Sequence, residues 1–191
     1  MTPLPDVGSL LHRAVSRFAA LVAAIRDPAW SNRTPCADWS VRDLVNHVTV
    51  EDLWAGELFA GRTIADVGTR FDGDRLGAVP LASFEESARA ALAAAAEPGA
   101  LTRTVHLSFG DVPGAEYAWQ LFADHLVHGW DLAIALGLSP RLDPDDVRAC
   151  LDWFEPHEDA YRSAGVIGLR PPVADEADPT IRLLASFGRT P

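Results

Sequence analysis

Apolar residues recur at intervals of three and four positions along most of this chain, which is the spacing of amphipathic helices. The first run predicts a helix from near Val7 to Ile25, which Asp27-Pro28 ends. Ser40 is a suitable N-cap for a second helix because Asp43 follows three residues later. This second helix is expected to extend to about Ala60.

The rest of the chain continues as helices separated by proline and glycine. The pattern predicts a long connection over 62–79 that borders a site entrance, followed by a third helix from Ser83 to Pro98-Gly99. An extended piece over 102–109 and a turn over 110–114 then lead into a fourth helix from Ala115 to Leu136. Asp143-Pro144 opens a fifth helix, and the tail after Gly165 is mostly coil. Glu155, His157 and Glu158 are expected to form a solvated acidic end of the fifth helix. The fold class is therefore all-α.

Length and composition limit the possible classes of protein. A chain of 191 residues that is 48% hydrophobic and 23% charged suits one globular domain over residues 1–191. The formal net charge of -11 argues against nucleic acid or an anionic membrane surface as a partner. No uninterrupted apolar run of about 18 residues occurs, so no membrane-spanning helix is expected. The N-terminus lacks a secretory signal pattern, which predicts a cytoplasmic location with Cys36 and Cys150 as free thiols.

The predicted fourth helix carries acids and histidines on an otherwise apolar segment. Asp124, His128 and Asp131 stand at i, i+4 and i+7, so they share one narrow face. An ionised aspartate buried among apolar groups needs a partner, and a divalent cation between Asp124 and His128 would supply one. Two other interpretations stay open: the stripe is the solvated face of an ordinary helix, or Asp124 and His128 pair with each other without a metal.

The predicted second helix supplies the other half of the candidate site. His47 lies at the edge of its apolar face, and Glu51 follows one turn later. His47 is either a core histidine satisfied by a carbonyl or water, or a third ligand facing Asp124 and His128. Two imidazoles and a carboxylate are a common ligand set for zinc that leaves a coordination position open. Glu51 is the candidate general base beside that position.

Two separated motifs resemble a known family. The stretch from Thr34 to Val48 (TPCADWSVRDLVNHV) is followed by the stretch from Asp124 to Ala133 (DHLVHGWDLA), and the tail from Ala177 to Arg189 adds a further likeness. Together they are similar to the DinB-like superfamily. Within that superfamily they resemble an actinobacterial branch of the mycothiol-dependent maleylpyruvate isomerase metal-binding domain.

The resemblance implies a DinB-like four-helix bundle, here with an additional C-terminal helix and a coil tail. It implies that His47, Asp124 and His128 hold a divalent metal, zinc or nickel, and that mycothiol or a similar thiol is activated there. The family pattern has Glu where this chain has Asp124, so the helices approach more closely, the metal is bound through water, or the site is weaker. The segment after Leu138 is too short and helical to supply the isomerase's additional α/β domain, so maleylpyruvate is not the expected substrate.

Two functions are compatible with these residues. The first is a metal- and thiol-dependent transferase or isomerase that acts on small electrophiles. The second is a non-catalytic metal- or ligand-binding bundle, such as a sensor or interaction module. Arg42 is the candidate for binding a carboxylate of the thiol cofactor, with the alternative that it is merely solvated. By resemblance to other DinB-like bundles, a homodimer is also compatible with the chain.

Three neighbouring residues have open roles. Asp131 is either an acceptor for a histidine N–H, which would orient a metal ligand, or a part of the polar stripe. His125 is a reserve ligand that points about 100° away from Asp124. Cys36 is either a reactive thiol near the positive end of the second helix or a small apolar residue of the core.

Overall fold

The protein is described by a computed structural model that covers residues 6–174 and 176–190. Within this part the chain divides into two compact units, one over Val7–Ser139 and the other formed by the residues from Pro140 onward. The elements of the first unit are α1 (Val7–Ala24), the 3-10 turn η1 (Ala29–Ser31), α2 (Val41–Phe59), α3 (Ile64–Val67), α4 (Pro80–Ala96), β1 (Thr104–Leu107), β2 (Gly110–Pro113) and α5 (Gly114–Ala135). The elements of the second are α6 (Pro144–Phe154), α7 (Glu158–Ser163) and α8 (Pro179–Ser186).

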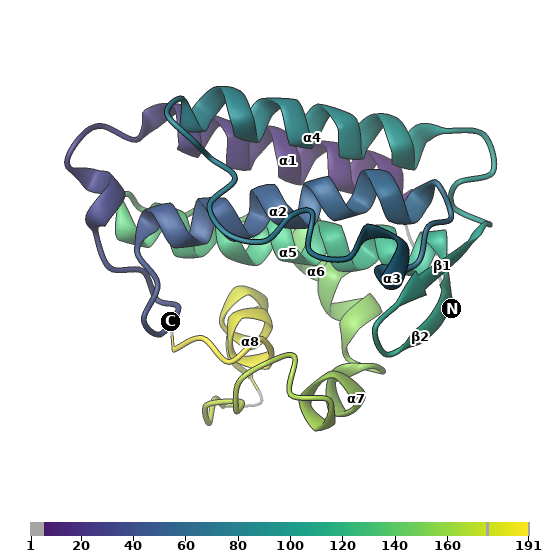
Figure 1. Ribbon diagram of the computed structural model, residues 1–191. Coiled ribbons are helices and arrows are strands. Elements are labelled where there is room, and N and C mark those ends of the chain that lie inside the picture. The colour runs from purple at the N-terminus through teal and green to yellow at the C-terminus, as the bar shows by residue number, and fades with distance from the viewer. Residues whose placement is uncertain (1–5, 175, 191) are drawn as a thin grey trace. The chain divides into compact units, whose positions relative to one another are not determined.

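Four long helices of the first unit form the predicted bundle (Figure 1). Helix α2 packs chiefly on α4 and α1 chiefly on α5, while the pairs α1–α4 and α2–α5 complete the ring. The core lies between them and is filled by fully buried aromatic and aliphatic side chains, including Phe18, Phe59, Phe84 and Phe122. Most of α5 is buried, including the polar residues His125, His128 and Asp131, while Glu116, Gln120 and Asp124 are partly exposed.

The helix that carries His47 begins at the predicted cap. The backbone N–H of Asp43 donates to Ser40 Oγ at 3.3 Å, and the N–H of Ser40 donates to Asp43 Oδ2 at 2.9 Å. This reciprocal capping box satisfies two N–H groups that have no partner within a helix. The third long helix begins earlier than predicted, at Pro80 rather than Ser83, because proline's fixed φ suits the first helical position.

The segment before α5 is a β-hairpin. Strand β1 confirms the predicted extended piece, but residues 110–113, expected only as a turn, form a second strand that pairs antiparallel with it. The register places Val105 opposite Val112 and Leu107 opposite Gly110. Gly114 follows directly and starts α5, so the hairpin fixes where the helix that carries Asp124 and His128 begins.

The second unit is built on α6, α7 and α8, and α6 packs on α8. Asp143 caps α6 by accepting a hydrogen bond from the N–H of Asp145 at 3.0 Å. The prediction that Glu158 lies at a solvated, acidic helix end is wrong, because this residue is only 8% exposed. Its carboxylate pairs with Arg162 at 2.5 Å and with Arg170 at 2.6 Å. A buried carboxylate of this kind is stable because both of its oxygens have a cationic donor.

Helix α1 passes a membrane-span test based on length and mean hydropathy alone. The core helix of a globular protein passes the same test, and α1 buries its apolar face, including Leu10, Leu11 and Phe18, within the bundle. The predicted absence of a spanning segment is neither confirmed nor contradicted by this property.

The tight junction in front of α5 gives a stability prediction. A Cβ atom at Gly114 would lie 2.0 Å from the carbonyl oxygen of Ala100, so Gly114→Ala must displace backbone. We expect it to lower the free energy of unfolding by about 3 kcal/mol, measured by urea denaturation.

Gly56→Ala is the matched control, because Gly56 lies inside α2 and a Cβ there meets nothing within 4 Å. This variant should raise the free energy of unfolding by roughly 0.5–1 kcal/mol through better helix propensity. Equal effects of the two substitutions would show that the hairpin junction does not constrain α5.

Candidate metal centre

Helices α2 and α5 bring two imidazoles to one carboxylate. His47 Nε2 lies 3.5 Å from Asp124 Oδ1, and His128 Nε2 lies 3.4 Å from the same oxygen. The two histidine rings stand nearly edge to face, with centroids 5.0 Å apart. The structure thus brings together all three residues predicted as ligands, from helices separated by more than 70 positions in the sequence.

This arrangement fits a divalent cation. One ligand atom from each of the three residues lies within 4.8 Å of the others. Two donor atoms bound at about 2.1 Å to a tetrahedral metal are themselves about 3.4 Å apart, which matches the nitrogen-to-oxygen distances here. Asp124 Oδ2 is buried and has no hydrogen-bond partner among the residues that the structure describes. A carboxylate in this state is suited to coordination.

The electrostatics of the cluster follow from burial and proximity. Burial alone would raise the pKa of the Asp124 carboxyl, but His128 and His47 beside it hold that pKa well below its usual range. Burial alone would lower the pKa of His128, but the carboxylate of Asp124 outweighs it and raises the pKa well above its usual range. Without a cation, the cluster therefore favours an ion pair between Asp124 and protonated His128.

The outer side of His128 is held by a second carboxylate. His128 Nδ1 lies 2.9 Å from Asp131 Oδ2, which assigns the proton to Nδ1 and directs Nε2 toward Asp124. The thiol of Cys36 donates to the same Asp131 oxygen at 3.2 Å. Asp131 is thus the acceptor that orients a candidate ligand, and Cys36 is a partly buried hydrogen-bond donor to it. Cys36, His128 and Asp131 also form a second group close enough to share a metal ion.

His125 does not join the cluster, although it was a reserve ligand. Its Nδ1 donates to the carbonyl of Leu121 at 2.9 Å, and its Nε2 lies 3.4 Å from Asp52 Oδ2. Both side chains are 1% exposed. Burial acts to lower the pKa of His125, but Asp52 more than offsets it and raises that pKa. The Asp52–His125 pair is a second buried polar contact between α2 and α5, one that the sequence pattern did not reveal.

Trp39 covers the two histidines and was not singled out from the sequence. Its ring lies 4.9 Å from that of His47 and stacks at 5.8 Å on that of His128. Trp39 directly precedes the N-cap Ser40, a position whose apolar side chain often packs on the first turns of the helix. Its position before the N-cap was the sequence signal that could have placed Trp39 against α2. A large ring at this point shields the imidazoles from water.

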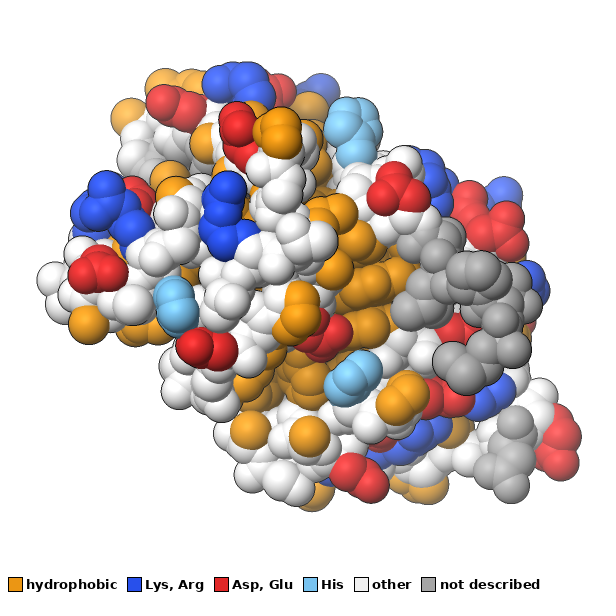
Figure 2. Space-filling model, turned by 90° about the vertical axis from the view of Figure 1, so that its right-hand side faces the viewer, with side chains coloured by type: hydrophobic (Ala, Val, Ile, Leu, Met, Phe, Trp, Pro, Cys, Tyr) orange, Lys and Arg blue, Asp and Glu red, His pale blue; other side chains and the backbone are white. Residues whose placement is uncertain are grey.

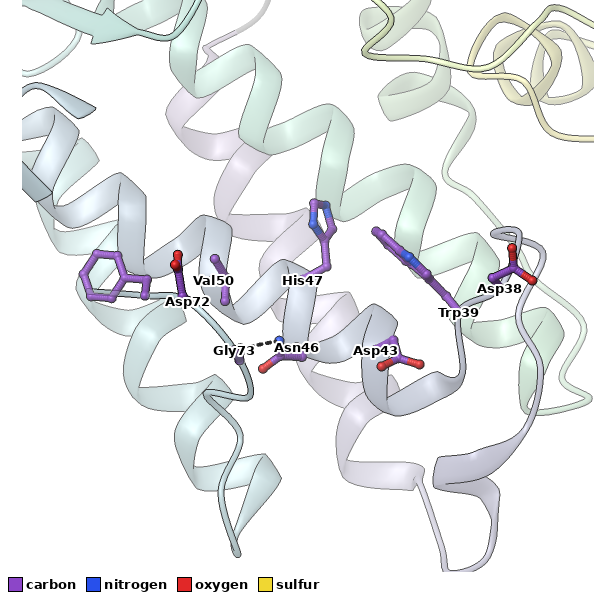
Figure 3. A pocket seen from close by; sticks show the side chains of 9 residues that line it. Asp38, Trp39, Asp43, Asn46, His47, Val50, Asp72 and Gly73 are labelled. Atoms are coloured by element: carbon purple, nitrogen blue, oxygen red, sulfur yellow. Dashed lines mark hydrogen bonds between the residues drawn. The ribbon is translucent and has the colours of Figure 1, made fainter. Parts of the chain in front are cut away.

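A cavity of about 500 Å³ adjoins the cluster (Figure 3). His47 and Trp39 line it together with Phe71 and Asp72, so the connection over 62–79 borders this cavity. Asn46 holds this connection against α2, because its Nδ2 donates to the carbonyl of Gly73 at 3.0 Å. His47 belongs to both the ligand cluster and the cavity wall, so the cavity meets the cluster at this residue.

The candidate base, Glu51, is partly buried on α2. Burial raises its pKa, and the negative charge of Asp124 raises it further. No arginine pairs with Glu51 in the part of the chain that the structure describes. Its surroundings therefore resemble those of a carboxyl tuned for proton transfer more than those of a surface residue.

The predicted cofactor-binding residue, Arg42, lies apart from the cavity lining. Its guanidinium donates to Asp74 Oδ2 at 2.6 and 3.0 Å and to the carbonyl of Gly77 at 2.9 Å. These bonds join α2 to the connection before α4. The role of Arg42 in binding a thiol stays a prediction.

The mostly helical bundle matches a DinB-like fold, and the comparisons with known proteins agree with this class. Residues 11–133 match the family described as the mycothiol maleylpyruvate isomerase N-terminal domain. The chain belongs to this family.

Its relatives include two uncharacterized proteins of Mycobacterium tuberculosis, from strains CDC 1551 and H37Rv. Each is 35% identical over 134 residues, which is 70% of this chain and 69% of the relative. Two crystal structures of a mycothiol-dependent maleylpyruvate isomerase, one of them a mutant, share the fold with TM-scores of 0.65 and 0.66. They are 16% and 15% identical, and the match covers 88% of this chain and 74% of theirs.

The pKa directions predict how the cluster affects stability without metal. His128, whose pKa is raised, contributes fully below about pH 6.5, and this contribution is lost as the pH rises through the raised pKa. Asp124, whose pKa is lowered, contributes fully above about pH 3.9, and its contribution is lost as the pH falls through the lowered pKa.

Both contributions are complete between about pH 3.9 and pH 6.5. For chelator-treated protein, the difference in free energy of unfolding between the parent and Asp124→Asn should therefore be largest in this range, and it should become smaller toward alkaline pH. Urea denaturation across a pH series measures this difference. Glu86→Gln, an exposed change on α4, should give a small difference that does not vary with pH. A pH-independent gap for Asp124→Asn would contradict the ion pair.

Proposed function

We propose that this protein is an enzyme that binds a divalent cation, zinc or nickel, through His47, Asp124 and His128. With mycothiol or a similar small thiol, it either isomerises a small electrophile or transfers the thiol to it. The observation that carries this proposal is the convergence of two imidazole nitrogens on one oxygen of a partly buried carboxylate, with His47 also lining a cavity. Three protein ligands leave a position for a substrate atom, which is the arrangement of catalytic rather than structural sites.

The chemistry follows from the residues around the ligands. A divalent cation lowers the pKa of a thiol bound to it, so the nucleophilic thiolate is available near neutral pH. Asp131 keeps the proton of His128 on Nδ1, which leaves Nε2 free to bind the cation. Glu51 accepts the thiol proton or moves a proton on the substrate, and burial together with Asp124 raises its pKa, which favours such an exchange. Trp39 covers part of both imidazoles.

The relatives support the thiol dependence and leave the substrate open. The structural neighbours carry the name mycothiol-dependent maleylpyruvate isomerase, but at 15–16% identity their likeness speaks for the fold. The family match ends at residue 133, and the described residues after Pro140 form only the helices α6, α7 and α8. We therefore propose the reaction class without assigning maleylpyruvate. A cytoplasmic location, a single domain and a homodimer also stay predictions.

Metal content tests the first half of the proposal. Untagged protein should contain about one equivalent of zinc or nickel by elemental mass spectrometry. His47→Ala and Asp124→Ala should each lose it, because two remaining ligands bind a cation weakly. His106→Ala is the matched control, since His106 pairs with Asp111 on the exposed hairpin and should leave the metal content unchanged.

A parent protein that stays metal-free after incubation with zinc and nickel would contradict the metal site. A parent that holds metal but transfers no thiol to any electrophile would instead favour the non-catalytic binding module.

Glu51→Gln tests the second half. It should lower kcat for mycothiol transfer by about 10²–10⁴-fold, the usual contribution of general acid–base catalysis, while the metal content is retained. Glu86→Gln on α4 provides the control for loss of one carboxylate. An unchanged kcat in Glu51→Gln would remove this residue from the mechanism.

A further inference from the structure

The cavity that leads to the candidate metal centre is lined by negative charge. Three carboxylates, those of Asp38, Asp43 and Asp72, contribute to its wall, and no arginine does. The remaining lining offers aromatic and apolar surface, chiefly Trp39 and Phe71. Such a cavity presents an electrostatic field that repels anions and a surface that binds an uncharged ring or alkyl group.

Three arginines near this cavity have acidic partners. Arg42 is bound by Asp74 and the carbonyl of Gly77, and Arg70, whose guanidinium lies 5.7 Å from the Phe71 ring, pairs with Glu57. Arg33 lies 3.4 Å from Asp38, but both side chains are exposed, at 71% and 96%. Exposed pairs of this kind neutralise little of the local field. Arg42 and Arg70 are therefore engaged by acids, and Arg75, which is exposed on the same connection, is not among the residues that line the cavity.

Two of the three acids differ in what holds their side chains. Asp43 belongs to the capping box of α2, and its hydrogen bonds with Ser40 hold its pKa below the usual range. Asp72 is exposed, and its side chain has no hydrogen-bond or ion-pair partner in the described part of the chain. It is the acid whose charge is most available to a molecule entering the cavity. Elsewhere, Figure 2 shows arginine and acidic side chains interspersed on the face it presents, without a continuous basic patch.

We propose that the electrophile accepted by this protein is uncharged or cationic, with an apolar body that lies against Trp39 and Phe71. Substrates with carboxylate or phosphate groups are rejected by the acidic wall. Maleylpyruvate, which carries two carboxylates, falls in the rejected class. This inference rests on the proposed function, because it assigns the cavity to the electrophile of the thiol reaction.

The size of the discrimination follows from Coulomb's law. Two unit charges about 6 Å apart in water change an affinity about threefold, and three carboxylates act together here. We therefore expect a monoanion to bind at least tenfold more weakly than a cation of the same shape at low ionic strength. Salt should reduce this ratio, because the groups are partly exposed.

Benzamidine, benzamide and benzoate form a suitable probe series, because they share shape and ring and differ in charge. Their binding to the protein as purified can be followed by the NMR shift of the Trp39 indole N–H, which also reports the location. The expected order of affinity is benzamidine, then benzamide, then benzoate. Asp72→Lys should raise the affinity for benzoate about tenfold and lower that for benzamidine about tenfold, since it changes the local charge by two units.

Glu86→Lys carries the same charge change on α4, outside the cavity lining, and should leave the order unchanged. Equal affinities for the three probes, tighter binding of benzoate, or no shift at Trp39 with any of them would overturn the inference. These outcomes are separate from those that test the proposed function. A protein without metal or thiol transfer can still prefer benzamidine to benzoate. Conversely, a protein that binds metal and transfers thiol can show no such preference.

Discussion

The architecture of the first unit is organised around a carboxylate enclosed between two helices. Asp124 lies on α5, a helix buried almost throughout, and an unpaired carboxylate there would be strongly destabilising. His128 from its own helix and His47 from α2 meet this requirement by placing their Nε2 atoms 3.4 and 3.5 Å away. The packing of α2 against α5 is therefore an electrostatic as well as an apolar contact, and the candidate site depends on it.

The surrounding structure keeps these groups in place. The capping box at Ser40 fixes the start of α2, and the hairpin before Gly114 fixes the start of α5. Asp131 and Cys36 hold the far side of His128, and Trp39 covers both imidazoles. Such support is needed because a ligand cluster functions only when its members stay within a few tenths of an ångström of their positions.

The shorter acid at position 124 does not prevent a compact cluster. The family pattern has glutamate where this chain has aspartate, one methylene shorter, yet Asp124 Oδ1 is within reach of both imidazoles. The connection over 62–79, held to α2 by Asn46, shapes a cavity beside the cluster that three aspartates line.

The sequence by itself determined the helices and the local spacing within them. Helical periodicity, proline and the Ser40 cap predicted α1, α2 and α5 closely, and the i, i+4 spacing placed Asp124 and His128 on one face. Contacts between helices depend on how each helix is rotated and packed, which a short-range pattern does not encode. The tertiary structure therefore decided that His125 turns to Asp52, that Trp39 stacks on the histidines, and that Glu158 is buried between two arginines. It also decided that residues 110–113 form a strand, because a four-residue strand gains its hydrogen bonds only from a partner.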